Sequence, residues 1–204
     1  MGTARSRGFL LSVVVGCLAL GACASTQLVN QWSNPGYSGP AFKKVMVVGV
    51  TRQAAIRRSF EDAFVAQLKA AGVNATASYP YIPQDGPVAE AVLKQAVKEA
   101  AVDGVIITRL VHVQQQTVVS PGYDVSDPAM VMHSFYTTAF NTNYEPPVVY
   151  HEEIYTCETT LYDAAKSQVV WRGTAQTTSL GDIDKEIQNY AEIMIRALKD
   201  KQLI

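Results

Sequence analysis

Blocks of apolar and polar residues along positions 41–204 predict strands and helices in turn. Val45 to Val50 is a continuous apolar run, which is typical of a strand buried on both faces. From Ile56 to Ala71, large apolar residues recur about every four positions, which predicts an amphipathic helix that ends at Gly72. The same signals predict a weaker strand at 73–79, a helix at 88–101 and a long strand at 105–119. This alternation favours parallel strands joined by crossover helices.

The second half of the chain has a different pattern. Residues 148–163 form a long strand pattern, a turn follows, and residues 168–178 form its hairpin partner. Asp182 can cap a final amphipathic helix. We therefore predict a mixed α/β (α+β) fold with element order β-α-β-α-β-β-β-α. Its five-stranded sheet has the order 2-1-3-4-5, with an antiparallel final hairpin and helices mainly on one face.

The segment between the two halves, residues 120–147, is predicted to be a long loop. It contains four prolines together with many large apolar and aromatic side chains. A loop of this length inside a compact domain is usually functional or disordered. We therefore take it as a candidate contact surface.

The first 22 residues match a bacterial lipoprotein signal peptide. Arg5 and Arg7 precede an uncharged apolar run over residues 9–20, which is too short to span a bilayer comfortably. The run closes on Leu20-Gly21-Ala22-Cys23, which resembles the lipobox. This pattern predicts cleavage between Ala22 and Cys23 and lipid attachment to Cys23. The alternative is a plain secreted protein with a chance cysteine near the cleavage site.

The lipid on Cys23 would be the protein's link to the membrane. Ala24 is not the aspartate that tends to retain such proteins in the inner membrane, so we expect the outer membrane, facing the periplasm. Residues 23–40 are polar and rich in Ser, Asn, Gly and Pro, which predicts a lipidated tether. Residues 41–204 are then expected to form a single domain.

Charge is distributed unevenly along the chain. No lysine or arginine lies between Arg109 and Lys166, and that stretch carries seven acidic residues: Asp124, Asp127, Glu145, Glu152, Glu153, Glu158 and Asp163. Such a surface would repel nucleic-acid phosphates and suit a basic protein or divalent cations. The alternative is that these charges disperse over a solvated surface. The predicted interaction surface combines the loop with the acidic strand: Tyr123, Phe135, Tyr136, Phe140, Tyr144, Glu152 and Glu153.

Candidate chemistry is sparse. The chain has no phosphate-binding glycine loop, dinucleotide fingerprint or nucleophile elbow. The sequence His151-Glu152-Glu153-Ile154-Tyr155 begins like a zinc-protease motif, but it lacks the second histidine. Its pattern also predicts a strand, whereas the motif requires a helix. His112 and His151 are weak metal candidates, with exposed positions near a sheet edge as the favoured alternative. Cys157 is expected to be a buried, unreactive thiol, and we expect no cofactor.

Several segments together resemble a proteobacterial outer-membrane lipoprotein family of unknown function. They are Trp32, Phe42-Lys43-Lys44-Val45, Arg57-Arg58-Ser59-Phe60-Glu61, Ala101-Val102-Asp103-Gly104-Val105 and Leu161-Tyr162-Asp163 with Val170-Trp171. The resemblance implies a fold similar to the curli-assembly and TolB amino-terminal lipoprotein domains. It implies no catalytic residue.

Three functions fit these observations. The first is a non-enzymatic module that binds an envelope protein, or a second copy of itself, through the loop and the acidic strands. The second is a periplasmic hydrolase that uses His112 or His151 with a neighbouring carboxylate. The third is a carrier of a small apolar ligand held by Met130, Met132, Phe135 and Phe140. We rank them in this order, and the first requires neither a cofactor nor a nucleic acid.

Overall fold

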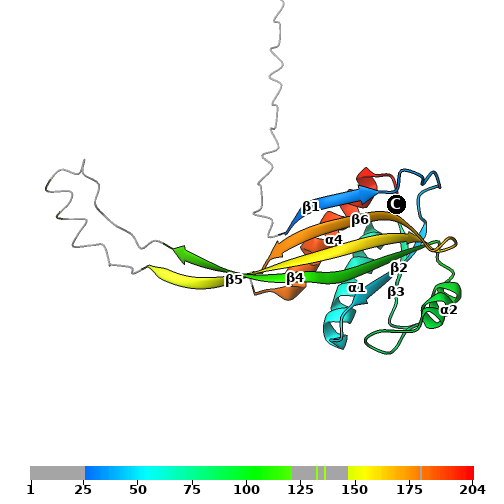
Figure 1. The fold of residues 1–204 in the computed structure, drawn as a ribbon, viewed down its shortest axis with the longest axis horizontal. Helices are drawn as coiled ribbons and strands as arrows, with labels where there is room; N and C mark the ends of the chain where they lie inside the picture. The colour runs from blue at the N-terminus through cyan, green and yellow to red at the C-terminus, as the bar shows by residue number, and fades with distance from the viewer. Residues whose placement is uncertain (1–25, 121–131, 133–135, 137–146, 180) are drawn as a thin grey trace, which may run out of the picture.

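The computed structural model describes residues 26–120, 132, 136, 147–179 and 181–204. Within these residues, one mixed sheet of six strands packs with three helices (Figure 1). The strands are β1 (Thr26–Ser33), β2 (Lys44–Val50), β3 (Asn74–Ala77), β4 (Gly104–Ser120), β5 (Val148–Asp163) and β6 (Gln168–Thr178). The helices are α1 (Ala54–Ala70), α2 (Glu90–Ala100) and α4 (Ile183–Asp200).

The strand order in the sheet is β1-β6-β5-β4-β2-β3. β2 pairs in parallel with β3 and β4, and the other neighbouring strands are antiparallel. The predicted mixed class is confirmed, and the five predicted strands have the neighbours that we expected. The predicted number of strands is wrong, because β1 adds a sixth strand at the edge beside β6.

β1 lies inside the segment predicted as a tether, residues 23–40, and that part of the prediction is corrected. Thr26 is only 2% exposed, and its Oγ1 lies 2.9 Å from Oγ1 of Thr177 on β6. Leu28 packs against the core, whereas most other β1 side chains face solvent. An edge strand with so few buried side chains lacks the apolar alternation that marks a strand in the sequence.

The main core lies between one face of the sheet and the helices α1 and α4. Phe64 and Leu68 of α1 meet Met194 and Leu198 of α4 over Trp171 of β6, and all five are fully buried. The shorter helix α2 packs on the opposite face in a smaller cluster with β2. Two of the three helices of the described residues therefore cover one face, as predicted. No helix in the described part of the chain is both long and apolar enough to span a membrane.

The cap of the last helix also follows the sequence prediction. The backbone N–H of Lys185 donates to Oδ1 of Asp182 over 3.1 Å, which satisfies one of the free donors at the start of α4. The buried side of α4 then presents an apolar stripe to the sheet.

Gly173 on β6 is required by the large side chain two residues before it. A Cβ at this position would lie 2.2 Å from Cη2 of Trp171, whose ring is fully buried. We expect Gly173→Ala to lower the free energy of unfolding by about 1–3 kcal/mol, because the ring must shift inside a packed core. Urea denaturation measures this, with Gly36→Ala as the control, since its Cβ would meet Asn34 at 3.4 Å. Equal stabilities of the two variants would contradict the proposed clash.

Candidate functional site

β4 and β5 extend beyond the rest of the sheet as a two-stranded arm (Figure 1). β2 pairs with β4 only as far as Arg109, and β6 pairs with β5 only from Ile154 onward. We call the projecting part, residues 112–120 and 148–153, the ribbon. No further strand of the described chain pairs with either outer edge of the ribbon. Unpaired strand edges of this kind are templates for pairing with another chain.

The ribbon and its base expose an unusual number of large apolar side chains. By register, Val113, Val119 and Val149 share one face of the ribbon, and Val148 and Tyr150 lie on the other. The exposed fractions of the apolar side chains here run from 40% to 58% for Leu110, Val111, Val113, Val119, Val148, Val149 and Tyr150. A run of exposed apolar residues on a free strand pair is typical of an interaction site.

The predicted interaction surface is only partly within the described residues. Glu152 and Glu153 lie on the ribbon, opposite Gln116 and Gln115 of β4. The side chain of Tyr136 is 61% exposed. Most of the predicted loop at 120–147 lies outside the described residues, as do four of its predicted contact residues: Tyr123, Phe135, Phe140 and Tyr144.

The acidic stretch divides into a neutralised part and an anionic part. At the base of the ribbon, Glu158 lies 3.0 Å from Arg109 of β4 and 3.7 Å from Arg172 of β6. Farther out, Glu153 accepts hydrogen bonds from Tyr155 Oη and Gln115 Nε2. Both hydrogen bonds lower the pKa of Glu153, and the one from Tyr155 has the larger effect. Glu153 therefore stays charged in neutral solution, and the part of the chain that the structure describes gives it no basic partner.

The structure does not bring the two candidate histidines together. His112 is opposite Thr156, and His151 is opposite Thr117, so five residue steps along β4 separate their positions. At about 3.4 Å per residue, this distance is about 17 Å. No group of three or more potential metal ligands occurs among the described residues. The protease-like sequence 151–155 lies on β5, as predicted, where successive side chains point to opposite faces.

Cys157 is half-buried on β5, opposite Leu110 and Ala175. Burial raises the pKa of its thiol to about 11. Because the thiolate is the nucleophilic form, a thiol with this pKa is almost entirely protonated and unreactive at neutral pH. The half-buried position and the raised pKa of the Cys157 thiol agree with the predicted unreactive thiol.

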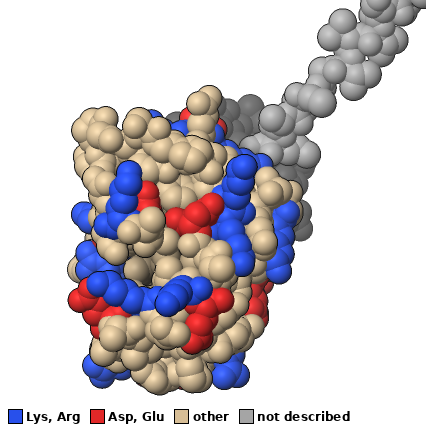
Figure 2. All heavy atoms as spheres, turned by 90° about the vertical axis from the view of Figure 1, so that its right-hand side faces the viewer, with Lys and Arg blue, Asp and Glu red and all other residues tan. Residues whose placement is uncertain are grey.

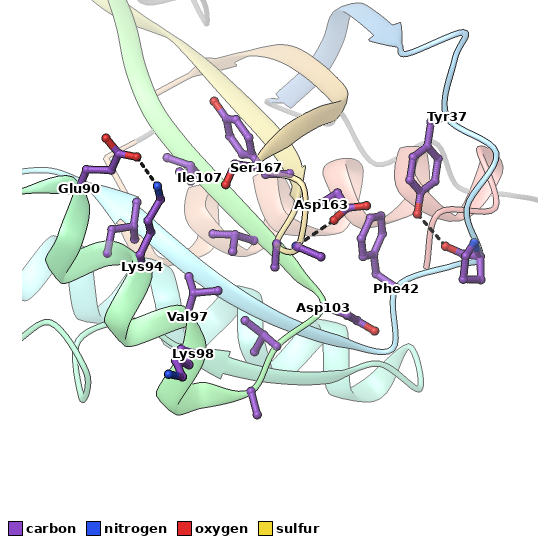
Figure 3. Close-up of a pocket in the computed structure, with 18 of the residues that line it drawn as sticks. Tyr37, Phe42, Glu90, Lys94, Val97, Lys98, Asp103, Ile107, Asp163 and Ser167 are labelled. Atoms are coloured by element: carbon purple, nitrogen blue, oxygen red, sulfur yellow. Dashed lines mark hydrogen bonds and ion pairs between the residues drawn. The ribbon is translucent and has the colours of Figure 1, made fainter.

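A groove of about 810 Å³ lies at the opposite end of the domain from the ribbon (Figures 2 and 3). Figure 3 shows Val97 of α2 and Ile107 of β4 on one side of this groove, with Phe42 and Tyr37 on the other. Phe42 and Tyr37 stack with their ring centroids 5.7 Å apart. The groove thus has an apolar lining at the edge of the sheet face that α2 covers.

Four of the five charged side chains that line the groove have partners within the described chain. Glu90 pairs with Lys94 over 2.6 Å on α2. Asp103 accepts hydrogen bonds from two backbone N–H groups at the start of β2, and Asp163 accepts two more within the β5–β6 turn. Basic and acidic residues are interspersed over this end of the molecule (Figure 2). These groups cap and connect elements, and none is positioned as a general acid or base.

Sequence reasoning missed the ribbon as a separate structure. It predicted both strands, but it treated their outer halves as part of the sheet. The available signal was the composition of 112–120, where Gln114, Gln115 and Gln116 interrupt the apolar pattern of β4. A strand with four consecutive polar residues, here 114–117, cannot be covered by helices on both faces at that point.

No family model matches the chain, and no curated protein matches it in sequence. Similar solved structures include a PelC dodecamer from Paraburkholderia phytofirmans, with 13% identity, coverage of 83% of this chain and 94% of that chain, and a TM-score of 0.46. A lipoprotein from Neisseria meningitidis has 10% identity, coverage of 79% and 99%, and a TM-score of 0.42. A putative neuraminyllactose-binding hemagglutinin homolog from Helicobacter pylori has 9% identity, coverage of 85% and 92%, and a TM-score of 0.31.

These likenesses are too weak to assign the chain to a family or to a function. The predicted similarity to the curli-assembly and TolB lipoprotein domains remains a prediction. We therefore infer function from the residues and geometry of this chain alone.

Proposed function

We propose that this protein is a lipid-anchored envelope lipoprotein whose domain is a non-enzymatic protein-interaction module, with the ribbon as its contact surface. The observation that carries the proposal is the ribbon itself. It combines two outer strand edges that pair with no other described strand, exposed apolar side chains on both faces, and an anionic Glu153. An isolated two-stranded ribbon is marginally stable in water, so a partner that covers it would stabilise it.

The ribbon supports one mode of binding in particular. A strand of the partner can add to the free edge of β4 or β5 by main-chain hydrogen bonds, and alternate side chains then determine specificity. The partner surface would be neutral or basic opposite Glu152 and Glu153, and either another envelope protein or a second copy of the chain can supply it. Nucleic acid is disfavoured, because its phosphates would meet the anionic strands.

The start of β1 and the ribbon lie at the same end of the sheet. Cys23 precedes Thr26 by three residues, and Thr26 pairs with Thr177, which pairs with Tyr155 near the base of the ribbon. Two strand spacings, about 10 Å, separate the start of β1 from β5. A lipid on Cys23 would therefore hold the ribbon close to the membrane surface, where a membrane-associated partner could reach it.

The geometry favours this function over the two alternatives. A hydrolase needs a histidine and a carboxylate converging in a cleft, whereas His112 and His151 lie on exposed positions far apart. A carrier built on the predicted apolar set would bury Met132, but that side chain is 88% exposed. The other members of that set lie outside the described residues.

A crosslinking pull-down from cell envelopes tests the ribbon. We expect the paired substitutions Val119→Lys and Val149→Lys to reduce recovery of the partner at least about tenfold, because two charges would enter an apolar contact. The control is Val29→Lys on β1, a valine of similar exposure outside the ribbon. The same partners at the same yield from both proteins would show that the ribbon is not the contact surface.

A further inference from the structure

A second cavity, of about 480 Å³, lies where β2 ends and α1 begins, between the sheet and the helices α1 and α4. From β2 the chain continues through α1 to β3, which pairs with one edge of β2. The other edge of β2 pairs with β4, which in turn pairs with β5. Crevices at such points, outside the carboxyl ends of neighbouring parallel strands, are where open α/β sheets commonly bind ligands. The volume is within the range of small-molecule sites. The apolar lining comes from Val50, Ile56, Phe60, Leu110, Ile183 and Ile187.

Three buried hydroxyl groups form a hydrogen-bonded row at the floor of this cavity. Oγ1 of Thr108 lies 2.7 Å from Oγ1 of Thr159, which lies 2.8 Å from Oη of Tyr190. Among the described residues, these three side chains make no other hydrogen bond. Two hydrogen bonds use two of the three hydroxyl hydrogens. Thr108 and Tyr190, at the ends of the row, both line the cavity, so either end can offer the third hydrogen to a bound acceptor.

The charge around the cavity selects against an anion. Glu186 lines it with only 9% of its surface exposed, and Ser179 Oγ donates to its Oε1 over 3.0 Å. Arg109 also contributes to the lining, but its guanidinium pairs with Glu158 over 3.0 Å. A ligand carboxylate would therefore be held in a low-dielectric site beside a like charge, which is unfavourable.

We propose that this cavity binds a neutral single-chain amphiphile, such as a fatty alcohol. Its oxygen accepts a hydrogen bond from Thr108 or Tyr190, and its alkyl chain contacts the apolar lining. The proposal is independent of the ribbon, since none of the ribbon residues lines the cavity and the ligand belongs to a different chemical class. It would give a domain held near a membrane a site for a lipid-derived molecule.

Methyl NMR of the full protein in lipid nanodiscs tests the proposal, with decanol and decanoate as probes. We expect decanol to shift the methyl signals of Ile56, Ile183 and Ile187, and to leave those of Ile82 and Ile195, outside the cavity, unchanged. Decanoate should bind at least about tenfold more weakly, because of Glu186. Absence of the three shifts at saturating decanol, or equal binding of decanoate, would overturn the proposal.

Substitutions in the cavity test which residues bind decanol. Thr108→Val with Tyr190→Phe should weaken decanol binding about five- to tenfold, the worth of one buried hydrogen bond. The matched control is Thr160→Val, a buried threonine on β5 outside the cavity, which should change binding less than about twofold. Val50→Trp, at an exposed position on the rim, should fill the cavity and abolish the shifts without disturbing the core. Unchanged shifts in Val50→Trp would place decanol elsewhere and refute the site.

Discussion

Glu61→Gln is expected to lower the free energy of unfolding by about 3–5 kcal/mol, because it removes one member of a buried ion pair. Glu61 is fully buried on α1. Its two carboxylate oxygens accept hydrogen bonds from the backbone N–H groups of Gly49, Ser78 and Tyr79, at 2.9, 2.7 and 3.1 Å. Its Oε1 also accepts from Nε of Arg57 at 3.0 Å. This one side chain therefore ties α1 to the ends of β2 and β3.

The partner side of the pair explains why the loss is large. Arg57 is only 4% exposed, and it donates to the backbone carbonyls of Ile82 and Gln84 at 3.0 and 2.9 Å. Without Glu61, its guanidinium keeps the partly exposed Asp85 at 3.2 Å as its only carboxylate partner in the described chain. A neutral amide at position 61 would also direct its own N–H groups at donors that need an acceptor.

Urea denaturation measures this effect, and Glu192→Gln is the matched control. Glu192 makes the same type of pair with Arg196, four residues later on a helix, at 2.6 Å but on the surface. Exposed pairs of this type contribute about 0.3–0.5 kcal/mol. A loss from Glu61→Gln no greater than that from Glu192→Gln would mean that the buried network does not hold the domain together.

Cys23→Ser is expected to move the protein from the membrane fraction to the soluble periplasmic fraction. Each buried methylene group contributes about 0.8 kcal/mol to membrane affinity, so a residue with several acyl chains is held essentially permanently. Serine offers no thiol for the attachment of these chains. Fractionation and immunoblotting measure the distribution, with the exposed change Val29→Lys as the control. A Cys23→Ser protein that remained entirely with outer membranes would refute the lipid anchor.

Much of the fold could be predicted because its signals are local. The apolar run 45–50 marks a strand covered on both faces, and the spacing of Phe60, Phe64 and Leu68 marks the buried side of α1. Asp182 precedes the apolar stripe of α4 and caps it. Each of these elements is determined by neighbours within a few residues, and crossover rules then restrict the order of the strands.

The rest depends on contacts between distant segments. β1 has few buried residues, and its pairing with β6 joins Thr26 to Thr177, which no local pattern indicates. The hydroxyl row at the cavity floor likewise joins β4, β5 and α4 through Thr108, Thr159 and Tyr190. The outer halves of β4 and β5 could be predicted as strands, but only the full set of pairings shows that no further strand of the described residues lies beside them.

A photo-crosslinking amino acid placed at single positions in living cells tests whether the ribbon is the contact surface. Val119 and Val149 are 57% and 58% exposed on one face of the ribbon, and Val92 is 37% exposed on α2. If the ribbon is that surface, positions 119 and 149 will give a discrete adduct of higher mass and position 92 will give none. Adducts of equal yield from all three positions, or none from the ribbon, would contradict this role of the ribbon.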